Sequence, residues 1–484
     1  MNFSRISFLL CLCCLLVATG LRAQLLNTNE HKHYEALNLQ QAIRYYTKLA
    51  KKEPSNGDAL FNLGNSYRLN GEFKKAEQWF SKAIRYVDNP LVNLYYAQML
   101  LSNRKYAEAA TYFRKYASLA ETASDANSAT LLAAYCEELN EHGLPADRFD
   151  VYKTNFNSEK LDFSPMYWGS PNKMIFASSR SIGKKTRLID NWTNDRFVDL
   201  FLVEKDAAGT WKDPRPLSEE INSKFHEGSV TFNPEGWKMY FTRNDYDNSR
   251  GYDQNRNTRL HIYSAVHDTI NPVNEEGETS IVWSQVEPMW FNSNEYSTAH
   301  PTISADGKTM ILASDRPGGF GQMDLYISRL EDEEWSEPEN LGEIINTSGN
   351  ELFPFLEPET NDLYFSSNLH VGLGGLDIFR AEWDDKRNRW GKPENVGPPL
   401  NSPRDDFGVI CDAGFTQGYF TSNRSSKTED DIYSFTLKKS LTIKGVVVDC
   451  ETRQPITDAQ VQVHINDEAG VVTADVDSEF NGSF

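Results

Sequence analysis

One pattern of residues occurs five times between about residues 147 and 437, and it constrains the fold more than any other feature. In the clearest copy, residues 301–328, two apolar segments flank Asp306-Gly307. A Gly-rich stretch then leads to a third segment that begins at Asp324. An Asp-Gly pair between apolar runs predicts a β-hairpin, because Gly readily adopts the positive φ that the turn needs. Each copy therefore predicts three short antiparallel strands.

A fourth segment completes each of the first four copies. It carries a Trp on or beside a strand, and an Asn-Ser or Asn-Thr pair then leads into the next copy. The four are Trp211, Trp283, Trp335 and Trp390. Four short strands repeated about every 50 to 70 residues are typical of propeller blades, although an ordinary β-sandwich also has short strands and polar turns.

These segments resemble the TolB-like branch of the WD40-like propellers. The resemblance covers residues 146–437 and implies a five-bladed, all-β propeller. The fifth copy lacks its fourth strand after Leu437, but an alternating segment, Phe149–Thr154, precedes the first copy and is followed by Asn157-Ser158. We therefore predict that Phe149–Thr154 pairs antiparallel with Ile432–Leu437, since an open outer edge invites pairing with other chains.

Residues 24–145 have a helical period instead. Several small and aromatic residues of one segment recur 33 residues later, as Leu63 and Tyr96 or Phe80 and Phe113 do. This spacing resembles the tetratricopeptide repeat, in which small residues let paired helices approach closely. Family members that hold a peptide carboxylate place Lys and Asn on the inner helix. Asn65 fits that pattern but Phe61 does not, so we expect a packing scaffold rather than a carboxylate clamp.

Both ends of the sequence carry further signals. Residues 1–23 have a basic residue, a short apolar run and a small residue at a candidate cleavage site, which predicts a signal peptide; acylation of a cysteine there is the less favoured alternative. Residues 441–484 alternate Val around a Thr-x-x-Pro turn and resemble part of a carboxypeptidase regulatory-like β-sandwich. We expect the sequence to be a truncated copy of a longer protein.

Charge limits the classes of partner. The chain has 49 basic and 69 acidic residues, a net charge of −20, and the acidity lies in the β part because residues 24–145 hold 14 basic and 13 acidic residues. That balance argues against a nucleic acid as partner. No apolar run is long enough to span a bilayer, so no transmembrane segment is expected.

The sequence contains few motifs that are typical of catalysis or metal binding. It contains neither a Gly-x-Ser-x-Gly elbow nor a His-Glu-x-x-His motif, and its nine histidines are scattered. We therefore predict no enzymatic activity, no catalytic residues, no metal site and no cofactor.

Two groups of polar residues are candidates for an interaction site. Loops that leave second strands and loops that enter first strands lie on one face of a propeller, and they carry Arg180, Arg243, Arg316, Arg424, Asp162, Glu227, Glu351 and Asp405. These charges either pair with one another across adjacent strands or form a polar rim around the central channel.

The second group lies in two long loops on that face, residues 181–198 and 244–258. Trp, Tyr and Arg are enriched at binding hot spots, and loops longer than a fold requires are usually functional or disordered. We therefore predict a partner-binding surface formed by Arg187, Trp192, Arg196, Tyr246, Arg250, Tyr252 and Arg256.

The three parts, in this order, resemble the PorE-like class of OmpA-family envelope proteins, which includes components of the type IX secretion machinery. The resemblance implies a non-enzymatic periplasmic scaffold associated with the outer membrane, with other envelope or secretion proteins as partners. Peptidoglycan would be bound only through a C-terminal OmpA-like domain that this sequence does not contain. The alternative is a ligand-sensing propeller that binds a peptide or glycan in its central channel.

Overall fold

The computed structural model divides the chain into two units, residues 1–437 and 438–484. It describes residues 39–145, 147–181, 196–223, 225–244, 259–267, 282–425, 429–438, 446–456, 460–467 and 470–477. The predicted signal peptide, residues 1–23, lies outside this part of the chain.

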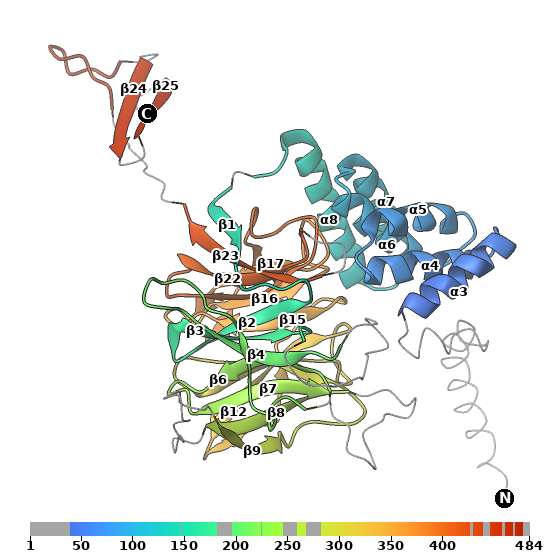
Figure 1. Ribbon diagram of the computed structural model, residues 1–484. Helices are drawn as coiled ribbons and strands as arrows, with labels where there is room; N and C mark the ends of the chain where they lie inside the picture. Colours follow the sequence, from blue (N-terminus) through green and yellow to red (C-terminus); the bar gives the residue numbers. More distant parts are fainter. Residues whose placement is uncertain are drawn as a thin grey trace, which may run out of the picture. The chain divides into compact units, whose positions relative to one another are not determined.

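Six helices form the described N-terminal part of the first unit (Figure 1). They are α3 (Leu39–Lys52), α4 (Gly57–Leu69), α5 (Phe73–Ala83), α6 (Leu91–Ser102), α7 (Tyr106–Leu119) and α8 (Ala123–His142). The 33-residue period sets their packing, because Ala76, Phe80 and Phe113 are fully buried where adjacent helices meet. A Cβ at Gly64 would come within 2.9 Å of the Phe80 ring, so this helix pair needs a glycine at its crossing. The predicted helical repeats are confirmed.

The rest of the first unit is a propeller of five β-sheets, as predicted (Figure 1). The first blade holds β2 (Asp162–Trp168), β3 (Ser170–Ser178), β4 (Asp199–Glu204) and β5 (Arg215–Pro216). The second holds β6 (Glu227–Phe232), β7 (Lys238–Asn244), β8 (Leu260–His267) and β9 (Trp283–Pro288). The third holds β10 (Thr298–Ile303), β11 (Thr309–Ser314), β12 (Asp324–Glu331), β13 (Glu334–Trp335) and β14 (Glu339–Asn340).

The fourth blade holds β15 (Glu351–Leu356), β16 (Leu363–Ser367), β17 (Asp377–Ala381) and β20 (Glu394–Asn395), beside a small hairpin of β18 (Trp383–Asp384) and β19 (Arg389–Trp390). The fifth holds β21 (Asp406–Cys411), β22 (Gln417–Ser422), β23 (Asp431–Leu437) and β1 (Phe149–Lys153). First strands contact one another in the order β2, β6, β10, β15, β21 and back to β2, so they are the innermost strands of a closed ring.

The fifth blade is closed by the strand that precedes the first blade. β1 pairs antiparallel with β23, with Phe149 opposite Leu437 and Lys153 opposite Tyr433. Phe149 is buried, and its ring packs edge to face against Phe415 and Phe435. The predicted closure across some 280 residues is therefore confirmed. The entropic cost of this closure is modest, because loop-closure entropy grows only logarithmically with length.

The Asn of each Asn-Ser or Asn-Thr pair holds the third strand of a blade. Asn401 Oδ1 accepts a hydrogen bond from Ile378 N (2.7 Å), and its Nδ2 donates to Ile378 O (2.8 Å). Asn157 makes the same two bonds to Ile432, which ties the segment after β1 to the fifth blade. The remaining members are Asn222, Asn292 and Asn346, bonded to Leu200, Ile262 and Leu325.

The second unit, described by itself, contains a hairpin of β24 (Gln460–Asp467) and β25 (Gly470–Asp477). The expected turn at Thr452–Pro455 is present: Asp449 Oδ1 accepts a hydrogen bond from Thr452 N (2.7 Å), and Val448 and Pro455 form an antiparallel bridge. These elements are consistent with a β module, and they do not identify the regulatory-like family.

Candidate functional site

The candidate charges of the loop face are largely engaged in ion pairs inside the blades. Arg180 lies 2.5 Å from Asp162, and Arg243 lies 3.0 Å from Glu227. Both acids are fully buried at the start of a first strand. Arg243 lies in the second strand opposite Glu227, and Arg180 lies two residues after the end of β3. The arginine of such a pair also stacks on aromatic rings, as Arg180 does on Phe176 and Phe201. These pairs join strands within a blade.

The third, fourth and fifth blades vary this arrangement. Arg424 pairs with Asp406, whereas Asp405, which the sequence pattern singles out, instead bonds to Asn423 and to Leu376 N. Arg316 bonds to the exposed carboxylate of Glu337, because the first strand of its blade begins with Thr298 rather than with an acid.

Glu351 in the fourth blade has no arginine partner among the described residues, because Leu369 stands two residues after Ser367, at the position that Arg180, Arg316 and Arg424 hold in their blades. Its carboxylate accepts hydrogen bonds from Thr347 N, Thr347 Oγ1 and Ser367 Oγ. Burial raises the pKa of Glu351 to about 7, although these hydrogen bonds oppose the rise. A carboxyl group without a cation is thus buried in the loop face at this blade.

Of the seven residues of the predicted partner-binding surface, the structure describes Arg196. Its side chain is exposed, and Nη1 donates a hydrogen bond to Ser181 Oγ (2.6 Å). The others lie outside the described residues: Arg187, Trp192, Tyr246, Arg250, Tyr252 and Arg256. This surface remains a prediction.

The central channel is filled by side chains. Each innermost strand has an irregular pairing with its neighbour, and at this point one residue takes a positive φ: Ser164, Ser229, His300, Phe353 and Gly408. The His300 ring stacks on Phe353 with centroids 3.9 Å apart, and the two serine hydroxyl groups lie 3.1 Å apart. The remaining cavity is about 20 Å³, room for one water molecule. Burial lowers the pKa of His300 to about 3, so this imidazole is neutral at physiological pH.

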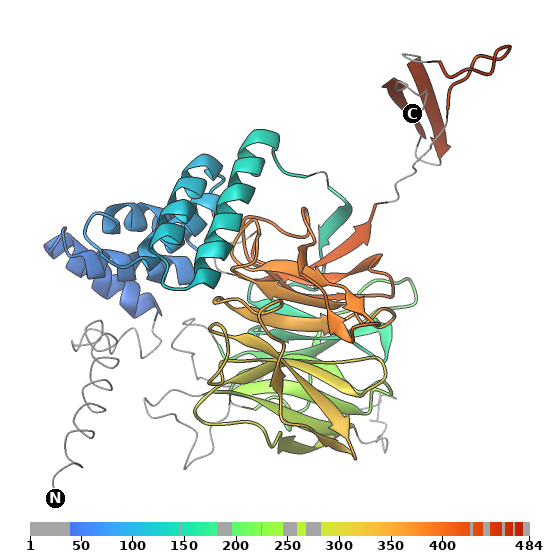
Figure 2. The same cartoon turned by 180° about the vertical axis from the view of Figure 1, so that it is seen from behind.

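The inner face of the helical repeats is occupied by propeller loops (Figure 2). Gln98, which follows Asn65 by one 33-residue period, donates a hydrogen bond from Nε2 to Asn368 O (3.2 Å). Leu369 and Leu373, in the loop between β16 and β17, are buried in the core of the helices.

Further contacts fix the same face. Arg404 donates to Gly71 O (2.9 Å) and stacks on Phe73, and Ser348 Oγ donates to the Asp125 carboxylate of α8. Sequence reasoning missed this interface. Its signal was the set of apolar residues in a Gly-rich loop, which includes Leu369 and Leu373.

The helical groove itself shows why a carboxylate clamp is not formed. Phe61 stacks on Tyr95 with centroids 5.9 Å apart, and Arg68 lies over the same ring. Asn65 accepts a hydrogen bond from Arg68 Nε (2.9 Å). A cavity of about 280 Å³ remains between helices and propeller, with Arg68, Gln98 and Asp405 among its lining residues.

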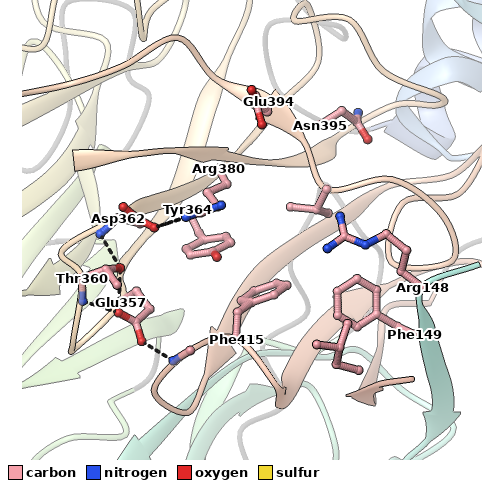
Figure 3. Close-up of a pocket in the computed structure, with 13 residues that line it drawn as sticks. Arg148, Phe149, Glu357, Thr360, Asp362, Tyr364, Arg380, Glu394, Asn395 and Phe415 are labelled. Carbon is pink, nitrogen blue, oxygen red and sulfur yellow. Dashed lines mark hydrogen bonds and ion pairs between the residues drawn. The ribbon is translucent and has the colours of Figure 1, made fainter. Parts of the chain in front are cut away.

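A second hollow, of about 220 Å³, lies at the seam of the fourth and fifth blades (Figure 3). Two of its acids are bonded within the blades: Asp362 pairs with Arg380 (2.6 Å), and Glu357 accepts hydrogen bonds from Thr360 and from Gly414 N. Tyr364 and Phe415 stack beneath them (4.4 Å), and burial raises the pKa of Tyr364. Because these groups form hydrogen bonds and an ion pair with one another, we interpret this hollow as a structural junction between the two blades.

Two classes of feature are not found in the part of the chain that the structure describes. No helix there has the length and apolar character needed to span a membrane. Within the same residues, no group of three or more His, Cys, Asp or Glu side chains is arranged to hold a metal ion.

Comparison with known proteins supports the helical repeats. A family model described as tetratricopeptide repeat matches residues 31–90, and no curated protein matches the chain in sequence. Among solved structures, TolB from Acinetobacter baumannii is 14% identical, with 66% of this chain and 72% of TolB covered and a TM-score of 0.33. A glycoside hydrolase is 10% identical, with 63% and 94% covered and a TM-score of 0.38.

A puromycin-hydrolyzing peptidase of Mycobacterium tuberculosis is 12% identical, with 56% of this chain covered and a TM-score of 0.30. The chain spans about a third of that peptidase, with 35% of its length covered. These likenesses concern the fold, and none of them assigns an activity to this chain.

Proposed function

We propose that this chain is a non-enzymatic periplasmic scaffold that joins other proteins of the cell envelope at the outer membrane. The observation that carries the proposal is the closed interior of the molecule. Propeller loops cover the inner face of the helical repeats, and the channel cavity measures only about 20 Å³. Tetratricopeptide and propeller domains commonly serve protein interaction. With the channel filled and the inner face of the helical repeats covered, the outer surfaces and long loops are left to bind partners.

The order of the domains supports a more specific assignment. A PorE-like protein of the OmpA family would join an envelope or type IX secretion assembly and reach peptidoglycan through a C-terminal OmpA-like domain. This assignment rests on the resemblance of the sequence. The alternative, a sensor that binds a peptide or glycan in the channel, is disfavoured because one water-sized cavity cannot hold a sugar ring.

The channel also gives little support to glycosidase chemistry. Most glycoside hydrolases use two carboxyl groups about 5 to 10 Å apart. The residues that line the channel cavity include Ser164, Ser229 and His300 and no Asp or Glu. The scaffold therefore fits the channel better than a glycosidase does.

The test is the state of the protein in its own cell envelope. A tagged copy, extracted from outer membranes with mild detergent, is expected to migrate well above its 55.1 kDa mass and to copurify with a constant set of envelope proteins. The double variant Trp192→Ala/Tyr252→Ala should lose that set. Trp237→Ala, which removes an indole that is 46% exposed in the second blade, should keep it. A monomer recovered in the soluble fraction without partners would contradict the proposal.

A further inference from the structure

A third hollow, of about 220 Å³, lies at the seam of the third and fourth blades and belongs to none of the sites described so far. On one side it is lined by the β10–β11 turn, which includes Asp306, and by Arg329 of β12. On the other side are Asn361 and the β18–β19 hairpin. Its size is below that of pockets for drug-sized ligands, which suits a single small ring.

Two indoles form the apolar part of this hollow. Trp383 is half-buried and Trp390 is buried, and the rings pack edge to face with centroids 4.9 Å apart. The N–H of Trp390 donates to Asn361 O (2.9 Å), and that of Trp383 donates to Asp385 (2.8 Å). Because both polar edges are already bonded, each ring is held in one orientation, and Trp383 keeps an accessible apolar surface.

The rim of the hollow carries unused hydrogen-bonding groups. The side-chain amides of Asn361 and Asn388 and the guanidinium of Arg329 make no hydrogen bond to any other described residue, and Asp306 has one oxygen free of such bonds. Asn361 and Asn388 have φ values of 59° and 50°, a conformation that Asn tolerates better than most residues. These groups offer both donors and acceptors, and the charges of Asp306 and Arg329 offset each other.

We propose that this hollow binds a neutral saccharide unit. A pyranose ring presents a patch of C–H groups that packs on the electron-rich face of an indole. Its hydroxyl groups both donate and accept hydrogen bonds, which matches two amides, one carboxylate and one guanidinium around a single ring. A charged ligand would meet a group of its own sign, and an apolar one would displace water from these polar groups without replacing its hydrogen bonds.

The experiment uses the full chain and three probes, cellotetraose, maltotetraose and xylotetraose, with binding measured by calorimetry and tryptophan fluorescence. At least one probe is expected to bind. Trp383→Ala should weaken that binding by about tenfold or more, as the loss of an aromatic anchor does at other interfaces. Asn361→Gly and Asn388→Gly, which keep the positive φ, should each weaken it severalfold without loss of folding. The control is Trp237→Ala, which removes a more exposed indole outside the hollow and should bind as the wild type does.

Three results would overturn the proposal. The first is that none of the probes binds to the wild-type chain. The second is that Trp383→Ala, with its fold verified by circular dichroism, binds a probe as tightly as the wild type. The third is that a proline-rich decapeptide binds in a Trp383-dependent way and at least about tenfold more tightly than every saccharide probe, since aromatic grooves also hold polyproline segments.

Discussion

At the scale of single residues, the structure gives a physical reason for the repeated Asn-Ser and Asn-Thr pairs. The amide of such an Asn has one acceptor and one donor, which match the C=O and N–H of a residue in the third strand, as Asn401 does with Ile378. Gln carries the same amide on a longer side chain, whereas the hydroxyl group of Ser or Thr has its donor and its acceptor on one atom. The residue thus supplies the backbone hydrogen bonds that a neighbouring strand would otherwise supply.

We predict that Asn401→Ala lowers the free energy of unfolding by about 1 to 3 kcal/mol, because it leaves the N–H of the buried Ile378 without a partner, while the Ile378 C=O keeps the hydrogen bond from Val396 N. Chemical denaturation followed by tryptophan fluorescence measures this change. Asn388→Gly is the control, since that Asn is exposed and its amide is not bonded, and its effect should stay within about 0.5 kcal/mol. Equal effects of both variants would show that the amide pairing adds no stability.

Glu351 gives a prediction about pH. Its pKa of about 7 lies above that of an unfolded Glu. The contribution of this group to the free energy of unfolding is therefore largest at low pH and is lost as the pH rises through 7. Between pH 6 and 8.5 this group should cost the wild type about 1 to 2 kcal/mol. Glu351→Gln keeps the shape and removes the charge, so its melting temperature should change less over this range than that of the wild type. Parallel pH profiles for the two proteins would contradict the assignment.

At the scale of elements, the outer strand β1 determines whether the ring closes. Its inward residue Phe149 is buried between Phe415 and Phe435, whereas Tyr152 on the same strand is 65% exposed. Without this strand, β23 would present an unpaired edge.

We expect Phe149→Ala to lower the free energy of unfolding by about 3 to 5 kcal/mol, the usual cost of removing a buried Phe. Tyr152→Ala, a change of similar size on the outer side of the same strand, should cost less than about 1 kcal/mol. Thermal and chemical unfolding of the two variants compare them directly. A Tyr152 variant as unstable as the Phe149 variant would mean that the strand packs differently.

At the scale of the whole molecule, the helices and the propeller form one unit, and the C-terminal segment forms another. Leu369 and Leu373 hold the helices and the propeller together, because both belong to a propeller loop and are buried among the helices.

Leu369→Asp should therefore separate the helices from the propeller, because a buried, unpaired carboxylate is strongly unfavourable. Small-angle X-ray scattering is expected to report a larger radius of gyration, with the propeller still folded by circular dichroism. Leu131→Asp, on α8 at a position that is 42% exposed, should leave the radius unchanged. An unchanged radius for the Leu369 variant would show that other contacts suffice.

Limited proteolysis tests the boundary of the second unit. We predict cleavage near Lys438 that removes the C-terminal segment and leaves the propeller intact, since few contacts cross a boundary between units. Mass spectrometry identifies the product. Equal resistance on both sides of Lys438 would contradict this prediction.

The sequence by itself determined the elements, because periodicity and turn chemistry are local. The 33-residue period predicted the paired helices, and five copies of one strand pattern predicted five blades. Even the closing strand could be predicted, because an Asn-Ser or Asn-Thr pair follows the fourth strand of each blade and Asn157-Ser158 follows β1. In each of these cases neighbours in the sequence carry the information.

Only the tertiary structure decided which side chains meet. Arg424 pairs with Asp406 and not with Asp405, its neighbour in the sequence. Leu369 packs among helices that lie more than 200 residues away in the sequence. Asn361 and Trp390 line one hollow together with Asp306 of another blade. Alternation along a strand cannot predict such contacts, because the side chain that fills a gap is selected by the shape of the facing blade or helix. That shape depends on how the whole ring closes.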